Sequence, residues 1–207
     1  MPASIYVLVG ANGAGKSSIG GALFAANDVD YFNPDLAAKT LLDAHPALTQ
    51  TQANAHAWEQ GRRGLARALE TGGTYAFETT LGANTIPDML IKGATSGAEI
   101  HVWFAGLATP ELHIERVQAR VAAGGHPIPE AKIRERYTSS RQNLIRLLPH
   151  LASLRVYDNS EDNDPKQGAQ PEPKLVLHME NGRIEFATKT VPQWAKAIVM
   201  AAVRAQA

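Results

Sequence analysis

The sequence contains no cysteine among its 207 residues. A fold without cysteine needs no disulfide, cannot use a cysteine zinc site and suits a reducing compartment. An excess of charge is also absent, since 20 basic residues balance 20 acidic ones, and aromatic residues make up only 6% of the chain. Proteins that bind nucleic acids broadly use basic surfaces and stacking aromatic side chains. Both absences therefore count against a nucleic-acid partner.

Long hydrophobic segments are missing as well. Residues 1–10 have no basic region ahead of their apolar run, so they do not resemble a signal peptide. The apolar segment 195–203 contains Lys196 and is too short to span a bilayer. We therefore expect a cytoplasmic protein with no membrane partner.

What is present is a pattern of alternating strands and helices. Short apolar runs predict strands over 5–9, 30–33, 74–79, 100–107 and 155–158. Helical segments are predicted between them, over 16–26, 53–70, 111–123 and 129–148. This alternation predicts an α/β fold, a doubly wound and mostly parallel five-stranded sheet with helices on both faces.

The C-terminal part of the chain has a different pattern. Residues 161–173 are polar and rich in proline and glycine, which predicts an exposed loop. Asn181-Gly182 between two alternating runs predicts a β-hairpin, and a helix is expected from about Pro192. We expect a core over 1–160 with a lid around 111–148, the loop 161–173, and a hairpin and helix over 174–207 packed on the same domain.

The clearest motif follows the first predicted strand. It runs Gly10-Ala11-Asn12-Gly13-Ala14-Gly15-Lys16-Ser17 and fits the P-loop, or Walker A, pattern G-x-x-x-x-G-K-[ST]. Glycines let backbone N–H groups converge on phosphate oxygens, and the following helix directs its N-terminus at the anion. We expect Lys16 to bridge the β- and γ-phosphates of ATP and the Ser17 hydroxyl to ligate Mg²⁺. The alternative is a glycine-rich turn with a solvated lysine.

Carboxylates follow two further predicted strands. The sequence has neither a guanine-reading N-K-x-D segment nor an L-S-G-G-Q segment, which argues against a GTPase switch and a transport ATPase. Asp35 comes just after residues 30–33 and is placed to take a proton from an attacking hydroxyl, although it could equally cap a helix. Glu78 and Thr80 share one side of an extended strand and could bind a polar acceptor; the alternative for Glu78 is a structural cap.

Arginine is concentrated in two consecutive predicted helices. Arg116 and Arg120 lie four residues apart on one face, and the next helix adds the residues Arg134, Arg136, Arg141 and Arg146. Phosphoryl transfer needs positive charge around the phosphate oxygens. The segment 124–129 between the helices is typical of a mobile joint, so we expect a lid that closes over ATP. Solvated helix faces paired with glutamates are the alternative.

Taken together, these motifs resemble the zeta-toxin family of P-loop kinases, including relatives described as predicted ABC-type ATPases. The resemblance covers about residues 4–160 and includes Asn33-Pro34-Asp35, Phe77-Glu78-Thr79-Thr80-Leu81 and 133–137. The family phosphorylates a hydroxyl of UDP-N-acetylglucosamine. The resemblance implies nucleotide binding by the loop from Gly10 through Ser17 and Ser18, general-base action by Asp35, and acceptor binding by Glu78 and Thr80. It also implies lid arginines at Arg120 and Arg136, with Arg134 as a rival to Arg136, and an adenine-proximal position for Asn159.

The sequence also departs from the family. A further substrate-binding glutamate of the family aligns with Arg62, with Glu59 nearby, which leaves the acceptor open. Toxicity and an antitoxin partner are unsupported by this sequence. We expect an ATP- and Mg²⁺-dependent kinase for a small-molecule hydroxyl, with UDP-N-acetylglucosamine as the leading acceptor. The alternatives are a nucleic-acid 5′-hydroxyl kinase, suggested by the arginine-rich helix, and a non-catalytic ATP-binding module.

Overall fold

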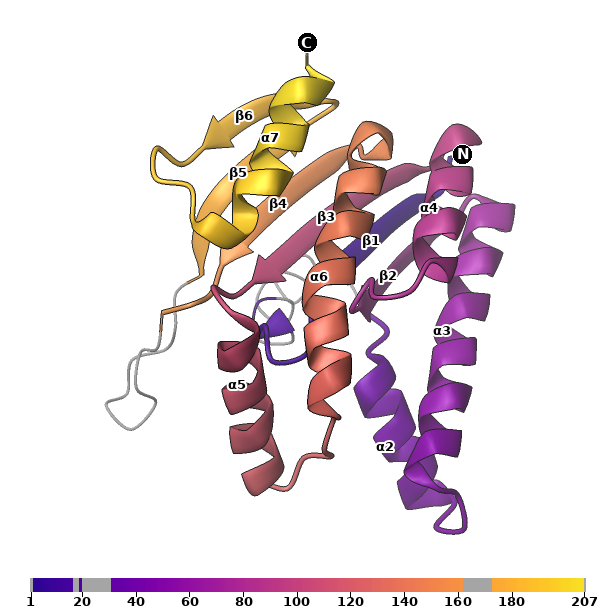
Figure 1. The fold of residues 1–207 in the computed structure, drawn as a ribbon. Helices are drawn as coiled ribbons and strands as arrows, with labels where there is room; N and C mark the ends of the chain where they lie inside the picture. The colour runs from indigo at the N-terminus through magenta and orange to yellow at the C-terminus, as the bar shows by residue number, and fades with distance from the viewer. Residues whose placement is uncertain (1, 17–18, 20–30, 162–172, 207) are drawn as a thin grey trace.

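A single sheet organises the protein. The computed structural model describes residues 2–16, 19, 31–161 and 173–206. Its six strands lie in the order β2-β1-β3-β4-β5-β6 (Figure 1). Their bounds are β1 Ser4–Val9, β2 Thr74–Thr79, β3 Glu99–Gly106, β4 Ser153–Asp158, β5 Lys174–Glu180 and β6 Arg183–Ala187. The first four strands in this order pair in parallel, and β5 and β6 add antiparallel pairs at one edge.

The predicted five-stranded, mostly parallel sheet is therefore wrong in its strand count and in one of its members. Of the predicted strand 30–33, the described residues make a single parallel bridge between Phe32 and Phe77. Phe32 donates to the Ala76 carbonyl and accepts from the Glu78 amide, and the chain then turns directly into a helix. The C-terminal hairpin instead extends the central sheet, which makes the sheet mixed.

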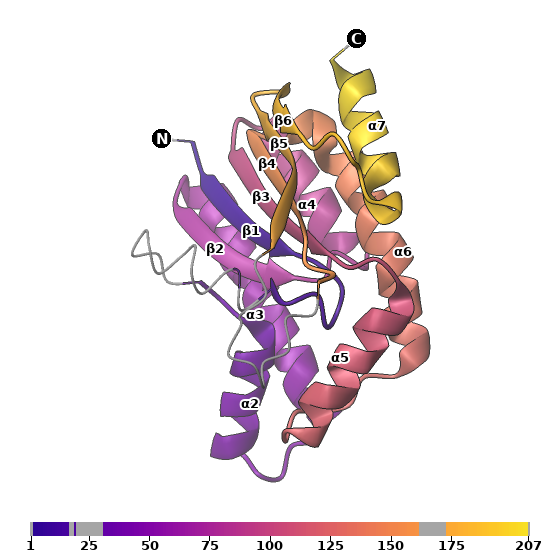
Figure 2. The ribbon, with the colours of Figure 1, turned by 90° about the vertical axis from the view of Figure 1, so that its left-hand side faces the viewer.

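Four helices cover one face of the sheet. The longer helices within the described residues are α2 Pro34–Ala44, α3 Gln50–Thr71, α4 Thr85–Thr95, α5 Pro110–Ala122, α6 Glu130–Leu147 and α7 Lys196–Ala205. Buried residues of α3, α4, α6 and α7 form one apolar cluster with Ile5, Val7 and Val9 of β1, because alternate strand residues point to the same face. Figure 2 shows α6 and α7 stacked on this side of the sheet.

The opposite face carries a smaller cluster. Leu8 lies there with Ala76 and Ala105, next to Ile19. Of the predicted helix 16–26, only Lys16 and Ile19 are described, and both are helical. The rest of that helix lies outside the described residues.

Local signals account for most helix ends. Asn33 caps α2, because its side-chain oxygen accepts from the amides of Asp35 and Leu36; Asp35 itself is not the cap. Thr109 caps α5 as its sequence predicts, with Pro110 in the first turn. Helix α4 was not predicted from the sequence, and its N-cap residue Asn84 makes no side-chain cap bond.

Several helices extend beyond one end of the sheet. In Figure 1, α2, α5 and the lower parts of α3 and α6 project past the edge where β1, β2 and β3 end. The carboxyl ends of parallel strands are where ligands bind in open α/β sheets. No helix in the described part of the chain is long and apolar enough to cross a membrane.

Candidate active site

The predicted phosphate loop leaves β1 and closes tightly on neighbouring segments. Gly13 has φ 82°, and a Cβ there would lie 2.6 Å from the carbonyl oxygen of His113. Gly15 has φ 81°, and its Cβ would lie 2.4 Å from Nδ2 of Asn159. Only glycine fits both positions without strain, and the resulting curvature is what a polyphosphate-binding loop requires. Ser17 and Ser18 lie outside the described residues.

Two buried polar side chains hold this loop from outside. Nδ1 of His113, from α5, donates to the Asn12 carbonyl at 2.7 Å. Nδ2 of Asn159, just after β4, donates to the Ala14 carbonyl at 3.0 Å. Burial lowers the pKa of His113 to about 4, so its imidazole is neutral at pH 7. Both side chains thus bind the backbone of the loop. Asn159 was a predicted site residue, whereas His113 was not identified from the sequence.

Lys16 lies at the end of the loop against an acid. Its Nζ is 3.4 Å from Oε1 of Glu78, and both side chains are 8% exposed. Nζ also donates to the Ala11 carbonyl at 3.5 Å. Asn33 donates to Oε2 of the same glutamate at 3.1 Å. The fold thus brings the phosphate-loop lysine and the predicted acceptor-binding glutamate into contact.

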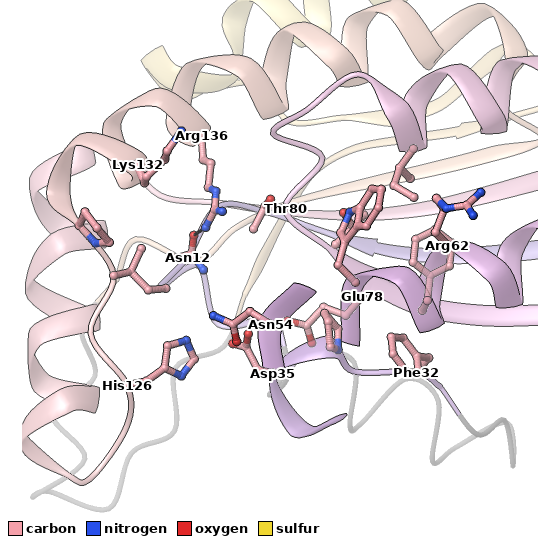
Figure 3. A pocket seen from close by; sticks show the side chains of 18 of the residues that line it. Asn12, Phe32, Asp35, Asn54, Arg62, Glu78, Thr80, His126, Lys132 and Arg136 are labelled. Atoms are coloured by element: carbon pink, nitrogen blue, oxygen red, sulfur yellow. Dashed lines mark hydrogen bonds between the residues drawn. The ribbon is translucent and has the colours of Figure 1, made fainter. Parts of the chain in front are cut away.

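A cleft of about 330 Å³ opens beside the loop (Figure 3). Its floor comes from the end of β2, including Glu78, Thr79 and Thr80. One wall is formed by α3 and the start of α2, and the other by the segment 126–129 and α6. The cleft therefore lies between the strand ends and the predicted lid, with Asn12 of the phosphate loop on its lining.

Asp35 lines this cleft and pairs with a lid arginine. Its Oδ2 lies 3.6 Å from Nη1 of Arg120, which comes from α5. The Asp35 side chain is 48% exposed, so it remains accessible to a ligand. Nε and Nη2 of Arg120 are buried and have no hydrogen-bond partner among the described residues. Arg120 itself is not part of the cleft lining.

Arg136 reaches the phosphate loop from α6. Its Nη1 donates to Oδ1 of Asn12 at 2.8 Å, and the side chain lines the cleft. Arg134 points elsewhere: its Nη1 pairs with Oε1 of Glu111 at 2.6 Å, and it is absent from the lining. Of these two candidate lid arginines, the fold brings Arg136 to the phosphate loop and the cleft.

Several lining residues were not identified from sequence as site residues. Asn54 and Trp58 come from α3 and His126 from the segment after α5. Arg62, also from α3, had been noted only through its alignment with a family glutamate, and it does line the cleft. The four-residue spacing of the α3 residues is a helical stripe that the sequence displays. Without a known neighbour, such a stripe does not reveal what it faces.

The residues present fit a nucleotide polyphosphate better than a protein-held metal. Asn12 of the curved loop and Arg136 lie together at one end of the cleft, and Lys16 contacts Glu78 of its lining (Figure 3). No group of three or more metal-ligating side chains exists among the described residues. Magnesium in phosphate-transfer sites is held mainly by substrate phosphates with one or two protein ligands, so this arrangement suits it.

Comparisons with known proteins agree with the fold. No protein-family model matches the chain. The sequence is 26% identical to an uncharacterized protein of Haemophilus influenzae over 133 residues, which are 62% of this chain and 88% of that protein.

Two solved structures resemble the whole chain. A chain of the AvrRxo1-ORF1:-ORF2 complex with ATP matches 97% of this chain with a TM-score of 0.64 and 16% identity, and this chain spans only 64% of its length. A chain of the PezAT chromosomal toxin–antitoxin system of Streptococcus pneumoniae matches 99% of this chain and 85% of its own length, with a TM-score of 0.55 and 13% identity. These likenesses show a shared fold.

Proposed function

We propose that this protein is an ATP-dependent kinase that transfers the γ-phosphate to a hydroxyl of a small molecule. The observation that carries the proposal is the convergence of Asn12, Asp35, Glu78 and Arg136 on one cleft beside the phosphate loop. The fold shared with an ATP-bound structure and with a chain of a toxin–antitoxin system also supports it.

Four side chains in and beside the cleft have roles in this reaction. Lys16 binds the β- and γ-phosphates, with the loop amides around them. The Asp35 carboxylate accepts the proton of the acceptor hydroxyl as its oxygen attacks the γ-phosphorus, and ADP leaves. Arg136 stabilises the charge that develops on the transferred group, and Arg120 orients Asp35 through their 3.6 Å ion pair.

Glu78 and Thr80 complete the proposed acceptor site. Glu78 accepts from Asn33 at 3.1 Å, which orients its carboxylate beside the phosphate loop. Magnesium, when bound with the nucleotide, neutralises phosphate charge, and Ser17 is the residue of the motif that would hold it. Asn159 supports the loop through the Ala14 carbonyl. Arg134 keeps a secondary role, holding α5 and α6 together through Glu111.

The leading acceptor is a nucleotide sugar such as UDP-N-acetylglucosamine. The cleft volume of about 330 Å³ suits a small polar molecule, and the Glu78–Thr80 floor offers hydrogen-bonding groups to sugar hydroxyls and amides. An antitoxin-like protein partner is proposed only by analogy with the PezAT system.

Phosphorus NMR of ATP with UDP-N-acetylglucosamine and the protein tests the proposal, and a new phosphomonoester signal is expected. Asp35→Asn should lower kcat by about 100-fold or more, because general-base catalysis contributes 10²–10⁴. Thermal stabilisation by ATP should persist in this variant. Asp43→Asn, an exposed acid on the same helix, is the matched control and should leave kcat unchanged.

The same experiment separates the alternatives. Absence of transfer to UDP-N-acetylglucosamine and to a panel of sugars, nucleosides and oligonucleotides would reject the kinase and leave an ATP-binding module. Transfer to an oligonucleotide 5′-hydroxyl alone would establish the nucleic-acid kinase instead.

A further inference from the structure

One wall of the cleft is a stripe on α3 that the proposed chemistry does not use. Asn54, Trp58 and Arg62 follow one another at four-residue spacing and all line the cleft. This spacing places side chains one above the other on a single helix face. The Trp58 side chain is 46% exposed and lines the cleft, so its ring is accessible to a bound ligand.

The guanidinium of Arg62 makes a bidentate ion pair on its own helix. Its Nε and Nη2 donate to the two carboxylate oxygens of Glu59, each at 2.7 Å. Glu59 also accepts from Arg63 at 2.8 Å, so one carboxylate serves two guanidinium groups and positive charge remains. Glu59 is not part of the cleft lining. Among the described residues, nothing accepts a hydrogen bond from Nη1 of Arg62.

Arg62 is also far from the reacting end of the cleft. In Figure 3 it lies on the opposite side from Asn12 and Arg136, with Glu78 between them. A group bound at Arg62 is therefore not the transferred phosphate but another part of the acceptor. A preoriented guanidinium is the residue of choice for planar recognition of phosphate or carboxylate.

We infer that the acceptor carries an anionic group, a phosphate or a carboxylate, which binds Arg62 while its reacting hydroxyl lies at Asp35. Trp58 packs against a ring of the acceptor between these two ends. This inference rests on the proposed kinase function and assigns Arg62 as the residue that binds the acceptor's anionic group.

Matched acceptor pairs test the inference. The pairs are N-acetylglucosamine with N-acetylglucosamine 1-phosphate, for the phosphate, and glucose with glucuronate, for the carboxylate. Transfer from ATP is followed by mass spectrometry, and binding of each compound by calorimetry. The wild-type protein should favour the anionic member of at least one pair by about tenfold or more in kcat/KM and in Kd, in line with a charged hydrogen bond.

Two substitutions on the same helix separate Arg62 from general charge. Arg62→Ala should remove the preference, raising KM about ten- to a hundredfold for the anionic acceptor with kcat nearly unchanged. Arg62→Lys should restore part of it. Arg63→Ala is the control, because Arg63 binds the same glutamate, is 76% exposed and does not line the cleft; its preference should match wild type. Glu59 keeps one arginine partner in either variant, so α3 should stay folded.

The outcomes are distinct. Transfer without any preference for the anionic members, or a preference that survives Arg62→Ala, overturns the inference and leaves the kinase intact. If no compound is phosphorylated, the proposed function fails and calorimetry decides the inference. Anion-dependent binding that Arg62→Ala abolishes then supports it, and equal or undetectable binding of both members overturns it.

Discussion

At the scale of single residues, His113 links helix α5 to the predicted phosphate loop. The side chain is 1% exposed, and its Nδ1–H donates to the Asn12 carbonyl at 2.7 Å. Burial disfavours the charged ring and lowers its pKa to about 4, with Lys16 as a further, smaller cause. The histidine thus keeps the loop backbone in place without adding charge to it.

This depressed pKa predicts a loss of stability in acid. Between pH 6.5 and 4 the unfolded chain binds a proton at His113 that the folded protein does not, so the free energy of unfolding falls as pH falls. The contribution is about 2 kcal/mol between pH 7 and pH 5. Urea unfolding at both pH values measures it.

Replacement of the histidine should remove that contribution. Between pH 7 and pH 5, the free energy of unfolding of His113→Gln should fall by about 2 kcal/mol less than that of wild type, because glutamine does not titrate. His45→Gln, at an exposed helix end, should keep the wild-type pH dependence. Identical pH dependence in all three proteins would contradict the assignment.

At the scale of elements, α6 serves both sides of the cleft. Arg136 reaches the phosphate loop, and two turns later Nδ2 of Asn143 donates to the carbonyls of Leu81 and Ala83, at 2.9 and 3.3 Å. Leu81 is buried with φ 54°, a left-handed conformation that costs about 1–2 kcal/mol for a side chain. The helix therefore stabilises the turn that presents Thr80.

Asn143→Ala tests this element. It leaves the Leu81 carbonyl buried without its donor, so the free energy of unfolding should fall by about 1–3 kcal/mol. Because Thr80 is presented by the released turn, KM for the acceptor should rise while the KM for ATP stays near wild type. Chemical denaturation and steady-state kinetics measure both effects. Asn84→Ala, exposed at the start of α4, should change stability by less than about 0.5 kcal/mol. Equal effects of the two variants would argue against this role of α6.

At the scale of the whole molecule, the C-terminal segment belongs to the central core. Trp194 is 4% exposed, stacks on Phe104 of β3 with ring centroids 6.1 Å apart, and donates to Oδ1 of Asp158 at 3.2 Å. Asp158 ends β4 and directly precedes Asn159, which contacts the phosphate loop. The C-terminal segment is thus connected to the phosphate loop through the adjacent residues Asp158 and Asn159.

Trp194→Ala should destabilise the protein as a unit. Loss of a buried tryptophan costs about 3–5 kcal/mol, and a single cooperative transition is expected in calorimetry. Val203→Ala, at a residue of α7 that is 54% exposed, should cost less than about 0.5 kcal/mol. A separate early transition for residues 174–206 would show that the hairpin and helix fold independently of the core.

Much of the fold was predictable because its signals are local. The run 5–9 and the motif after it define a strand and a loop through their own residue types, and Asn181-Gly182 defines a turn. Residues 31–33 of the predicted strand make a single bridge instead, because local residue types do not determine how many backbone hydrogen bonds a neighbouring strand can offer. α4 went unnoticed because it has no capping side chain.

Residue type and spacing predicted the phosphate loop, Asp35 beyond it and the arginines of two consecutive helices, because each of these signals depends on neighbours along the chain. Three contacts of the site join residues that are 62 to 124 positions apart along the chain. They are those of Lys16 with Glu78, of Arg136 with Asn12 and of His113 with the Asn12 carbonyl. Such contacts follow from strand order and helix placement, which arise from burial of the whole core. The placement of Arg136 rather than Arg134 at the cleft, and of Arg62 on its lining, came from folding in three dimensions.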